Sequence, residues 1–377
     1  MAKPVFAERH TQLEEFTQQW RPAGEEMHTA REVVRIPMVV HVVWRTAEQN
    51  ISDAQIQSQI EVLNEDFRRL NSDIDQITIP FQQSPADLEI EFYLAEVDPD
   101  GSPTNGITRT ATTTPNIGDF FTTGRRAICY ADLGGADAWC PDEYINVWVG
   151  ELSAGLAVTS FPEMDIPDED GIRIEPQVFG TIGTVEAPYD LGRTLTHELG
   201  HYFNLFHLWG SAFSCDVDDG VDDTPLQSDW YLNTCPGFLQ ISCGTPDMYM
   251  NFMNFTDDAC LHLFTEGQKD RVWATLNSTR SGLIMGNNCG VSSVSTSEED
   301  IFEVFPNPTT GSIRVELPQG QKGQLYLQDL NGNILQIWSV NSHLVEEIML
   351  KEWPVGIYFL KFVFRDMYLS KKLVLIR

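Results

Sequence analysis

The chain has 377 residues, of which 42% are hydrophobic and 21% are charged, and its formal net charge is −31 at pH 7. A chain of this length can form two domains with a substantial core, and its strong negative charge argues against a nucleic-acid partner because phosphates would be repelled. No stretch approaches the roughly 20 apolar residues of a membrane-spanning helix, so we expect no membrane span.

Residues 1–32 are polar and weakly patterned, apart from a candidate helix from Thr11 to Trp20. We interpret them as an N-terminal segment and a candidate propeptide remnant. They lack the apolar core of a signal peptide. Either the leader is missing from this version of the sequence or the protein is not exported, and we favour the first explanation.

The next elements are a strand, a helix and two further strands. The β-branched run from Val33 to Trp44 predicts a buried strand. Ser52 and Gln55 form a candidate capping box, and apolar residues follow it at helical spacing. The runs from Leu88 to Leu94 and from Tyr144 to Val149 predict strands. These elements precede the most informative motif of the chain.

Three of the eight histidines, His197, His201 and His207, fall within one segment that reads HELGHYFNLFH. On a helix, His197 and His201 share one face, where two imidazoles can bind one metal ion. His207 is too far along for that face, so the chain must turn sharply before it. Three neutral imidazoles leave the fourth position of a tetrahedral zinc open, and Glu198 is placed to reach water there. A chance pattern on a surface helix is the alternative; the clustering favours a zinc hydrolase.

Regular patterning stops after His207, and residues 208–265 are rich in Asp, Gly, Pro and Cys. A loop of this length is unusual unless it is pinned. Five aspartates within eight positions repel one another unless a hard cation gathers them, which favours calcium over a solvated acidic loop. These are Asp216, Asp218, Asp219, Asp222 and Asp223. The run from Thr265 to Leu276 then predicts a helix.

None of the seven cysteines forms the paired knuckles of a structural zinc site, and four of them bracket the segment between the predicted zinc helix and residue 260. This distribution suggests disulfides and therefore an oxidising compartment. Spacing alone does not give their connectivity. A disulfide between Cys129 and Cys140 is a guess based only on their closeness in sequence. Cys289 is then left without an assigned partner.

A Ser-rich stretch at residues 291–300 predicts a linker, and the pattern changes after it. Residues 301–377 contain short alternating strands and an Asn331-Gly332 hairpin signal, which predict a small all-β sandwich. The predicted strands run from Ser312 to Leu317, Leu325 to Leu330, Ile334 to Val340, Ile357 to Phe364 and Leu369 to Ile376.

Residues 33–290 resemble the metzincin clan of zinc peptidases and, within it, the pappalysin-like metallopeptidases of the bacterial cytophagalysin type. The resemblance rests on the zinc motif with its third His and on three further segments: residues 251–260 (NFMNFTDDAC), similar to the family's Met-turn, residues 219–225 (DGVDDTP) and residues 36–43 (IPMVVHVV). It implies an α+β fold, with a mixed twisted sheet plus helices and a loop-rich lower subdomain. It also implies that residues 171–180 form the sheet's edge, where an extended peptide can pair; an ordinary edge strand fits equally well.

The resemblance also implies roles for single residues. Met253 of the Met-turn forms an apolar floor under the metal. Calcium takes oxygens from the side chains of Asp219 and Asp223 and from the backbone carbonyls of Val221 and Thr224. Two disulfides are implied as well: Cys215–Cys243 and Cys235–Cys260.

The chain departs from the family pattern at two positions. Asn204 stands where the family usually has Gly, at a turn that needs a left-handed conformation, which Asn tolerates better than other non-Gly residues. Phe255 stands where related enzymes carry a Tyr thought to help hold the reaction intermediate. A Phe ring cannot donate that hydrogen bond.

Residues 301–377 resemble the C-terminal sorting domain of type IX secretion cargo from Bacteroidota. The motifs are residues 305–311 (FPNPTTG), 356–358 (GIY) and 371–374 (KKLV). A generic β-sandwich accessory domain is the alternative. The resemblance implies a secreted or cell-surface protein that contacts the secretion machinery through this domain, and it supports the explanation that a leader is missing.

Together these features predict a secreted zinc-dependent endopeptidase that acts on protein or peptide substrates. Glu198 would take a proton from the attacking water and pass it to the leaving amine. One alternative is a secreted binding or adhesion protein with a metzincin scaffold that has lost its catalytic activity. Phe255 is the residue that most favours this alternative. Another is a zinc enzyme that hydrolyses a non-peptide amide.

Overall fold

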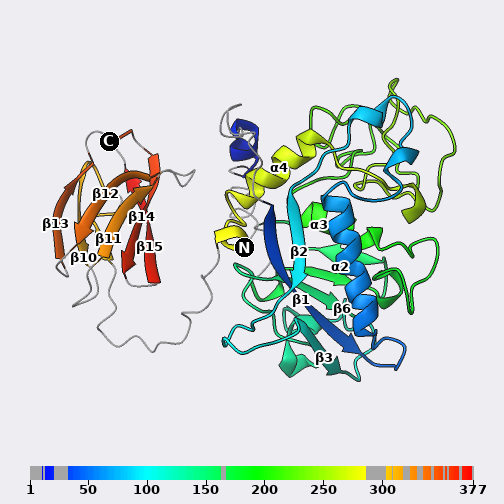
Figure 1. The fold of residues 1–377 in the computed structure, drawn as a ribbon, viewed down its shortest axis with the longest axis horizontal. Coiled ribbons are helices and arrows are strands. Elements are labelled where there is room, and N and C mark those ends of the chain that lie inside the picture. Colours follow the sequence, from blue (N-terminus) through cyan, green and yellow to red (C-terminus); the bar gives the residue numbers. More distant parts are fainter. Residues whose placement is uncertain are drawn as a thin grey trace. The chain divides into compact units, whose positions relative to one another are not determined.

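The computed structural model of the chain divides into two compact units, Met1–Gly290 and Val291–Arg377, and each is described by itself (Figure 1). No helix among the described residues is long and apolar enough to span a membrane. The structure describes residues 11, 13–20, 33–162, 167–285, 303–307, 309–316, 323–328, 334–340, 344–350, 353–354, 356–364 and 367–375.

A six-stranded mixed sheet forms the centre of the first unit. Its strand β1 pairs in parallel with β2, β3 and β6. Parallel strands are covered on both faces, which is why β1 is a continuous apolar run without alternation. The sequence did not reveal β3, because its ITRTA pattern is mostly polar and half-buried. The strands are β1 (Val34–Trp44), β2 (Ile90–Leu94), β3 (Ile107–Ala111), β6 (Ile145–Val149), β7 (Ala157–Thr159) and β8 (Ile172–Ile174).

One end of the sheet is β7, so the expectation that residues 171–180 form the edge is wrong. Strand β8, which lies in that segment, pairs in parallel with β6 on one side and antiparallel with β7 on the other. Both edges of β8 are therefore hydrogen-bonded to neighbouring strands. Strand β7 has only three residues and follows a Gly- and Ser-containing turn, so it carries too little alternation for sequence analysis to detect.

Helix α2 (Asp53–Phe67) packs against β2 and the helix that carries the histidines. Ser52 is its N-cap and accepts the backbone N–H of Gln55, as expected. The Gln55 side chain does not return the bond. It is buried and donates instead to the carbonyl oxygens of Pro176 (3.1 Å) and Phe179 (2.9 Å). This pair of bonds ties α2 to the segment that follows β8.

Three further helices follow α2 among the described residues of this unit: α3 (Arg193–Tyr202), α4 (Glu266–Leu276) and α5 (Gly282–Met285). In Figure 1, α2 and α3 lie side by side, and their contact is direct. Helix α4 begins with a complete capping box between Thr265 and Gln268. The apolar stripe of α3 lies in the main core and consists of Leu195, Leu199 and Tyr202.

Short elements connect these helices and strands. The hairpin strands are β4 (Phe121–Thr122) and β5 (Arg125–Arg126). The 3-10 turns are Ile74–Gln76, Phe81–Gln83, Ala127–Cys129, Ala131–Leu133, Pro167–Glu169, Pro176–Val178 and Asp258–Cys260.

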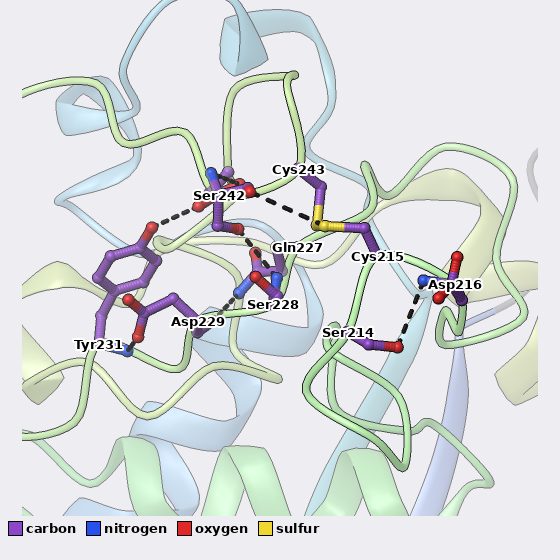
Figure 2. Close-up of a disulfide and its surroundings, with 10 residues drawn as sticks. Ser214, Cys215, Asp216, Gln227, Ser228, Asp229, Tyr231, Ser242 and Cys243 are labelled. Carbon is purple, nitrogen blue, oxygen red and sulfur yellow. Dashed lines mark hydrogen bonds between the residues drawn. A yellow bond between two sulfur atoms is a disulfide. The ribbon is translucent and has the colours of Figure 1, made fainter.

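Disulfides pin the loop-rich segment between α3 and α4. The structure forms the two bonds that the family resemblance implies, Cys215–Cys243 and Cys235–Cys260. Figure 2 shows the first of them between two stretches of loop. The guessed pair between Cys129 and Cys140 is wrong: Cys129 keeps a buried thiol beside Ile128 and Trp148, whereas Cys140 is disulfide-bonded elsewhere. Cys289 lies outside the described residues.

The second unit consists of antiparallel strands in two sheets, of order β13-β10-β9 and β12-β11-β14-β15. Their inward side chains form one apolar core that includes Val315, Leu327 and Leu360. The Asn331-Gly332 hairpin lies outside the described residues, and β9 and β13 were not predicted. The strands are β9 (Glu303–Phe305), β10 (Ser312–Glu316), β11 (Gly323–Gln328), β12 (Ile334–Val340), β13 (Leu344–Met349), β14 (Gly356–Phe364) and β15 (Met367–Leu375).

Candidate metal centre

The three histidines of the HELGHYFNLFH segment converge on one point. His197 and His201 project from successive turns of α3, which ends at Tyr202. Asn204 then takes a left-handed conformation (φ 73°), and this turn returns the chain so that His207 faces the other two rings. One ligand atom from each of the three residues lies within 4.8 Å of the others.

Hydrogen bonds fix which ring nitrogens point at the shared space. The Nδ1 atoms of His197 and His201 lie 2.7 Å from the carbonyl oxygens of Phe252 and Leu205. A carbonyl can only accept, so each Nδ1 carries the proton and donates it. The Nε2 lone pairs are then free to bind a metal ion, an arrangement typical of zinc-binding histidines.

The nitrogen separations fit one tetrahedral ion. The Nε2 of His207 lies 3.2 Å from that of His197 and 2.9 Å from that of His201. Tetrahedral zinc with bonds of about 2.0–2.1 Å places its ligand nitrogens roughly 3.3 Å apart. Unprotonated Nε2 atoms cannot hydrogen-bond to one another, so a shared cation explains their approach. The donor set of three neutral imidazoles therefore suits zinc with an open coordination position.

Burial keeps these imidazoles neutral. It lowers the pKa of His197 to about 4 and that of His201 to about 3, with the hydrogen bonds to the Phe252 and Leu205 carbonyls opposing the shift. The pKa of His207 is also lowered, first by burial and then by the two neighbouring rings. Neutral rings are the form that binds a metal ion, so burial favours metal binding at this site.

Glu198 lies beside the first ligand and lines the same cavity as the three histidines, which has a volume of about 430 Å³. Its carboxyl group is buried, and this burial raises its pKa to about 8, while the positive charge of Arg173 opposes the shift. A carboxylate held in such surroundings binds a proton readily. The position suits a group that accepts a proton from water in the cavity.

The cavity wall is largely apolar, and two groups of residues outside α3 contribute to it. The edge strand β7 and the turn before it contribute one side, from Gly155 to Thr159. Leu232 and Tyr189 contribute the other. The Tyr189 hydroxyl donates to Asn233 (2.5 Å), which joins the two segments of that second side.

Met253 lies in the core directly below α3. Its sulfur is so close to Gly200 that a Cβ atom on that residue would meet it at 2.3 Å. A larger residue at position 200 would therefore force the Met253 side chain to move away from the helix between the two histidine turns. The Met253 backbone N–H donates to Asn251 (2.9 Å), and the Asn251 amide is paired in turn with Gln268 of α4 (2.8 Å). The turn is thus fixed to α4.

Phe255 packs between the metal-binding rings and the lower subdomain. Its ring centroid lies 4.6 Å from that of His207 and 5.4 Å from that of His197. It also contacts Trp209 at 4.9 Å and lines the cavity. Its role is apolar packing, because the ring has no hydrogen-bond donor.

Two polar clusters that position the centre were not visible in the sequence. Arg193, at the start of α3, forms a buried ion pair with Asp66 of α2 (3.0 Å). Arg271 of α4 donates from Nε to the carbonyl oxygen of Asn204 (2.5 Å), and its guanidinium pairs with Glu14 from the N-terminal segment. These partners are separated by tens to hundreds of residues, so no local pattern connects them.

The two predicted calcium-binding aspartates of the acidic loop, Asp219 and Asp223, have different hydrogen-bond partners. Asp219 is buried; its Oδ1 accepts from Thr224 (2.7 Å) and from the Val221 N–H (3.2 Å), while its Oδ2 is buried without a hydrogen-bond partner. Asp223 instead accepts from Thr265 (2.6 Å) and the Gly267 N–H (2.9 Å) at the start of α4. The orphaned Asp219 oxygen is the kind of group that a hard cation satisfies.

The fold and the site together define a metalloendopeptidase of the metzincin type. A mixed sheet with an antiparallel edge strand, a helix with two histidines, a turn to the third and a methionine beneath them are its defining parts.

Comparisons with known proteins identify the family. Residues 131–277 match the peptidase M43 family, described as pregnancy-associated plasma protein-A, and residues 303–376 match the secretion system C-terminal sorting domain. Mature mirolysin of Tannerella forsythia, solved with a cleaved peptide, is 42% identical, with coverage of 68% of this chain and 97% of that chain and a TM-score of 0.63. A mutant promirolysin of that organism is 38% identical, with coverage of 75% and 92% and a TM-score of 0.65. An extracellular metalloprotease of Arthroderma benhamiae is 28% identical over 258 residues, which are 66% of this chain and 80% of that protein.

The chain therefore belongs to the peptidase M43, or pappalysin, family. It is a secreted or cell-surface metalloendopeptidase with a C-terminal sorting domain.

Proposed function

We propose that this protein is a zinc-dependent endopeptidase that hydrolyses peptide bonds in polypeptide substrates with Glu198 as its general base. The observation that carries the proposal is the convergence of three Nε2 atoms beside a buried carboxyl group in one cavity. His197, His201 and His207 would hold the ion, with Met253 beneath them. When bound, zinc supplies a Lewis acid that acidifies water and polarises a carbonyl group.

Glu198 performs the proton transfers. It accepts the proton of the attacking water and then delivers it to the amine of the departing peptide. The carboxyl group that retains this proton can donate it in the second step. Phe255 cannot donate a hydrogen bond to the developing oxyanion, so we expect slower turnover than in relatives with Tyr at this position.

The edge strand β7 is suited to hold the substrate backbone. It ends the sheet order and lines the cavity beside Glu198. An extended peptide can pair with such an edge through main-chain hydrogen bonds, which leaves its side chains to occupy pockets. Mature mirolysin was solved with a cleaved peptide, and we propose a polypeptide substrate here as well.

The remaining assignments follow the same domain plan. We propose residues 1–32 as an N-terminal segment, 33–290 as the catalytic domain, 291–300 as a linker and 301–377 as the sorting domain that meets the secretion machinery.

We also propose a calcium ion in the acidic loop, with the side chains of Asp219 and Asp223 and the carbonyls of Val221 and Thr224 as ligands. The orphaned Asp219 oxygen supports it.

A fluorogenic peptide pool tests the proposal. The purified full chain should cleave peptides, lose this activity with a zinc chelator and recover it when zinc is returned. A zinc-loaded chain that cleaves no peptide would favour the rival, a binding protein on a metzincin scaffold. Cleavage of non-peptide amides alone would point to the other alternative.

A further inference from the structure

A row of aromatic rings leads from the metal centre to the protein surface. The His207 ring stacks on Trp209 (4.6 Å), and Trp209 stacks in turn on Phe213 (5.8 Å). Trp230 closes the row, with its ring 4.9 Å from Phe213 and 6.2 Å from Phe255. The metal ligands and the outermost rings thus belong to one packed cluster.

The two outer rings are exposed. Phe213 is 50% exposed and Trp230 is 41% exposed, whereas Trp209 beneath them is 2% exposed. Leu232, two residues after Trp230, is 47% exposed and lines the catalytic cavity itself. Exposed large apolar side chains that adjoin one another, as Phe213 and Trp230 do, can mark a binding surface, whereas singly exposed ones do not.

The backbone that carries these rings is strained. Phe213 has φ 47° and Tyr231, directly after Trp230, has φ 49°, in the left-handed region that bulky residues rarely adopt. Asn233, on the other side of Leu232, has φ 54°. Strain of this kind persists where the surroundings impose it and gathers at functional sites.

The loops on which the rings sit are fastened to one another, as Figure 2 shows. The Cys215–Cys243 disulfide holds the stretch that follows Phe213. On the other side, the Ser228 N–H donates to Ser242 (2.9 Å) and the Tyr231 hydroxyl donates to Asp247. The rings are therefore presented on a rigid support, which lowers the entropy cost of binding.

We infer that Phe213 and Trp230, here called the aromatic platform, form a subsite that binds one bulky apolar side chain of the polypeptide substrate. The inference rests on the proposed function, because Trp230 contacts Phe255, which lines the catalytic cavity. A side chain such as Phe or Leu would cover the two exposed rings. Its burial corresponds to roughly a 10-fold or larger gain in kcat/KM over Ala at that position.

Position-scanning peptides test the platform on the full-length chain. The wild type should prefer a bulky apolar residue at one position near the scissile bond, and both Phe213→Ala and Trp230→Ala should reduce that preference to about 3-fold or less. Phe238→Ala is the matched control: Phe238 is 73% exposed on the same disulfide-pinned segment and is absent from the described ring contacts of the platform. Its substitution should leave the preference intact.

A second variant separates recognition from structure. Phe213→Gly removes the ring as Phe213→Ala does but avoids the strained φ, so its unfolding temperature should equal or exceed that of Phe213→Ala while the preference is lost in both. A lower unfolding temperature with an equal loss for every peptide would overturn the platform, as would an unchanged preference in both alanine variants. A wild type that cleaves no peptide would overturn the proposed function and the platform with it.

Discussion

Asn204 offers a quantitative test of how the third histidine is positioned. The residue is fully buried and left-handed, and its side-chain amide donates to Glu14 (3.1 Å) while its carbonyl oxygen accepts from Arg271. Two substitutions separate these contributions. Asn204→Ala removes the amide and keeps a Cβ atom, whereas Asn204→Gly removes both.

The expected magnitudes follow from the contacts. Loss of the hydrogen bond to the charged Glu14 costs about 2 kcal/mol, and the left-handed conformation costs Ala about 1 kcal/mol more than Asn. The Asn204 Oδ1 is buried without a partner, and its removal returns about 1 kcal/mol. Asn204→Ala should therefore lower the free energy of unfolding by about 2 kcal/mol. Asn204→Gly avoids the conformational cost and should lose about 1 kcal/mol.

Urea unfolding of the full chain with a chelator present measures these values without a contribution from bound metal. The order wild type, then Gly, then Ala is the firm prediction. A double-mutant cycle with Glu14→Ala should give a coupling energy of about 2 kcal/mol, the contribution assigned to the hydrogen bond between the two side chains. An Ala variant as stable as the Gly variant would refute the left-handed turn as the means of positioning His207.

Two further predictions concern pH and calcium. Burial lowers the pKa of His41 to about 4, against the Asn146 hydrogen bond and the charge of Asp137; the unfolded chain therefore takes up the proton first, and stability falls by about 3 kcal/mol as the pH drops from 6.5 to 4. His41→Gln should flatten this fall in urea unfolding measured across that range, and a slope equal to that of the wild type would contradict it. Millimolar calcium should raise the unfolding temperature of the wild type and of Asp216→Asn, which alters an exposed residue of the same loop, but not that of Asp219→Asn. An equal rise in all three would remove Asp219 from the calcium site.

The parts of the fold with strong local patterns could be predicted from the sequence. The β-branched run predicted strand β1, and the cap at Ser52 predicted the start of helix α2. The spacing of His197, His201 and His207 predicted that their rings converge on one metal site. The family resemblance supplied what spacing could not, namely the pairing of the cysteines around the acidic loop.

The missed features depend on contacts between distant residues. Strand β7 is defined by its pairing with β8, not by its own three residues. The Arg193–Asp66 ion pair and the Glu14–Arg271 contact join segments that only the folded chain brings together. Cys129 and Cys140 are close in sequence, but Cys129 is buried in an apolar cluster and Cys140 forms its disulfide with another residue.

The most direct test of the central claim is the activity and zinc content of Glu198→Gln. The substitution keeps the size of the side chain and leaves the three imidazoles untouched, but it removes the only proton acceptor assigned to the attacking water. We expect one zinc per chain by metal analysis, as in the wild type, and a fall in peptide cleavage of at least 100-fold, roughly what general base catalysis contributes. A zinc-loaded Glu198→Gln chain that cleaves peptides at the wild-type rate would contradict the assignment.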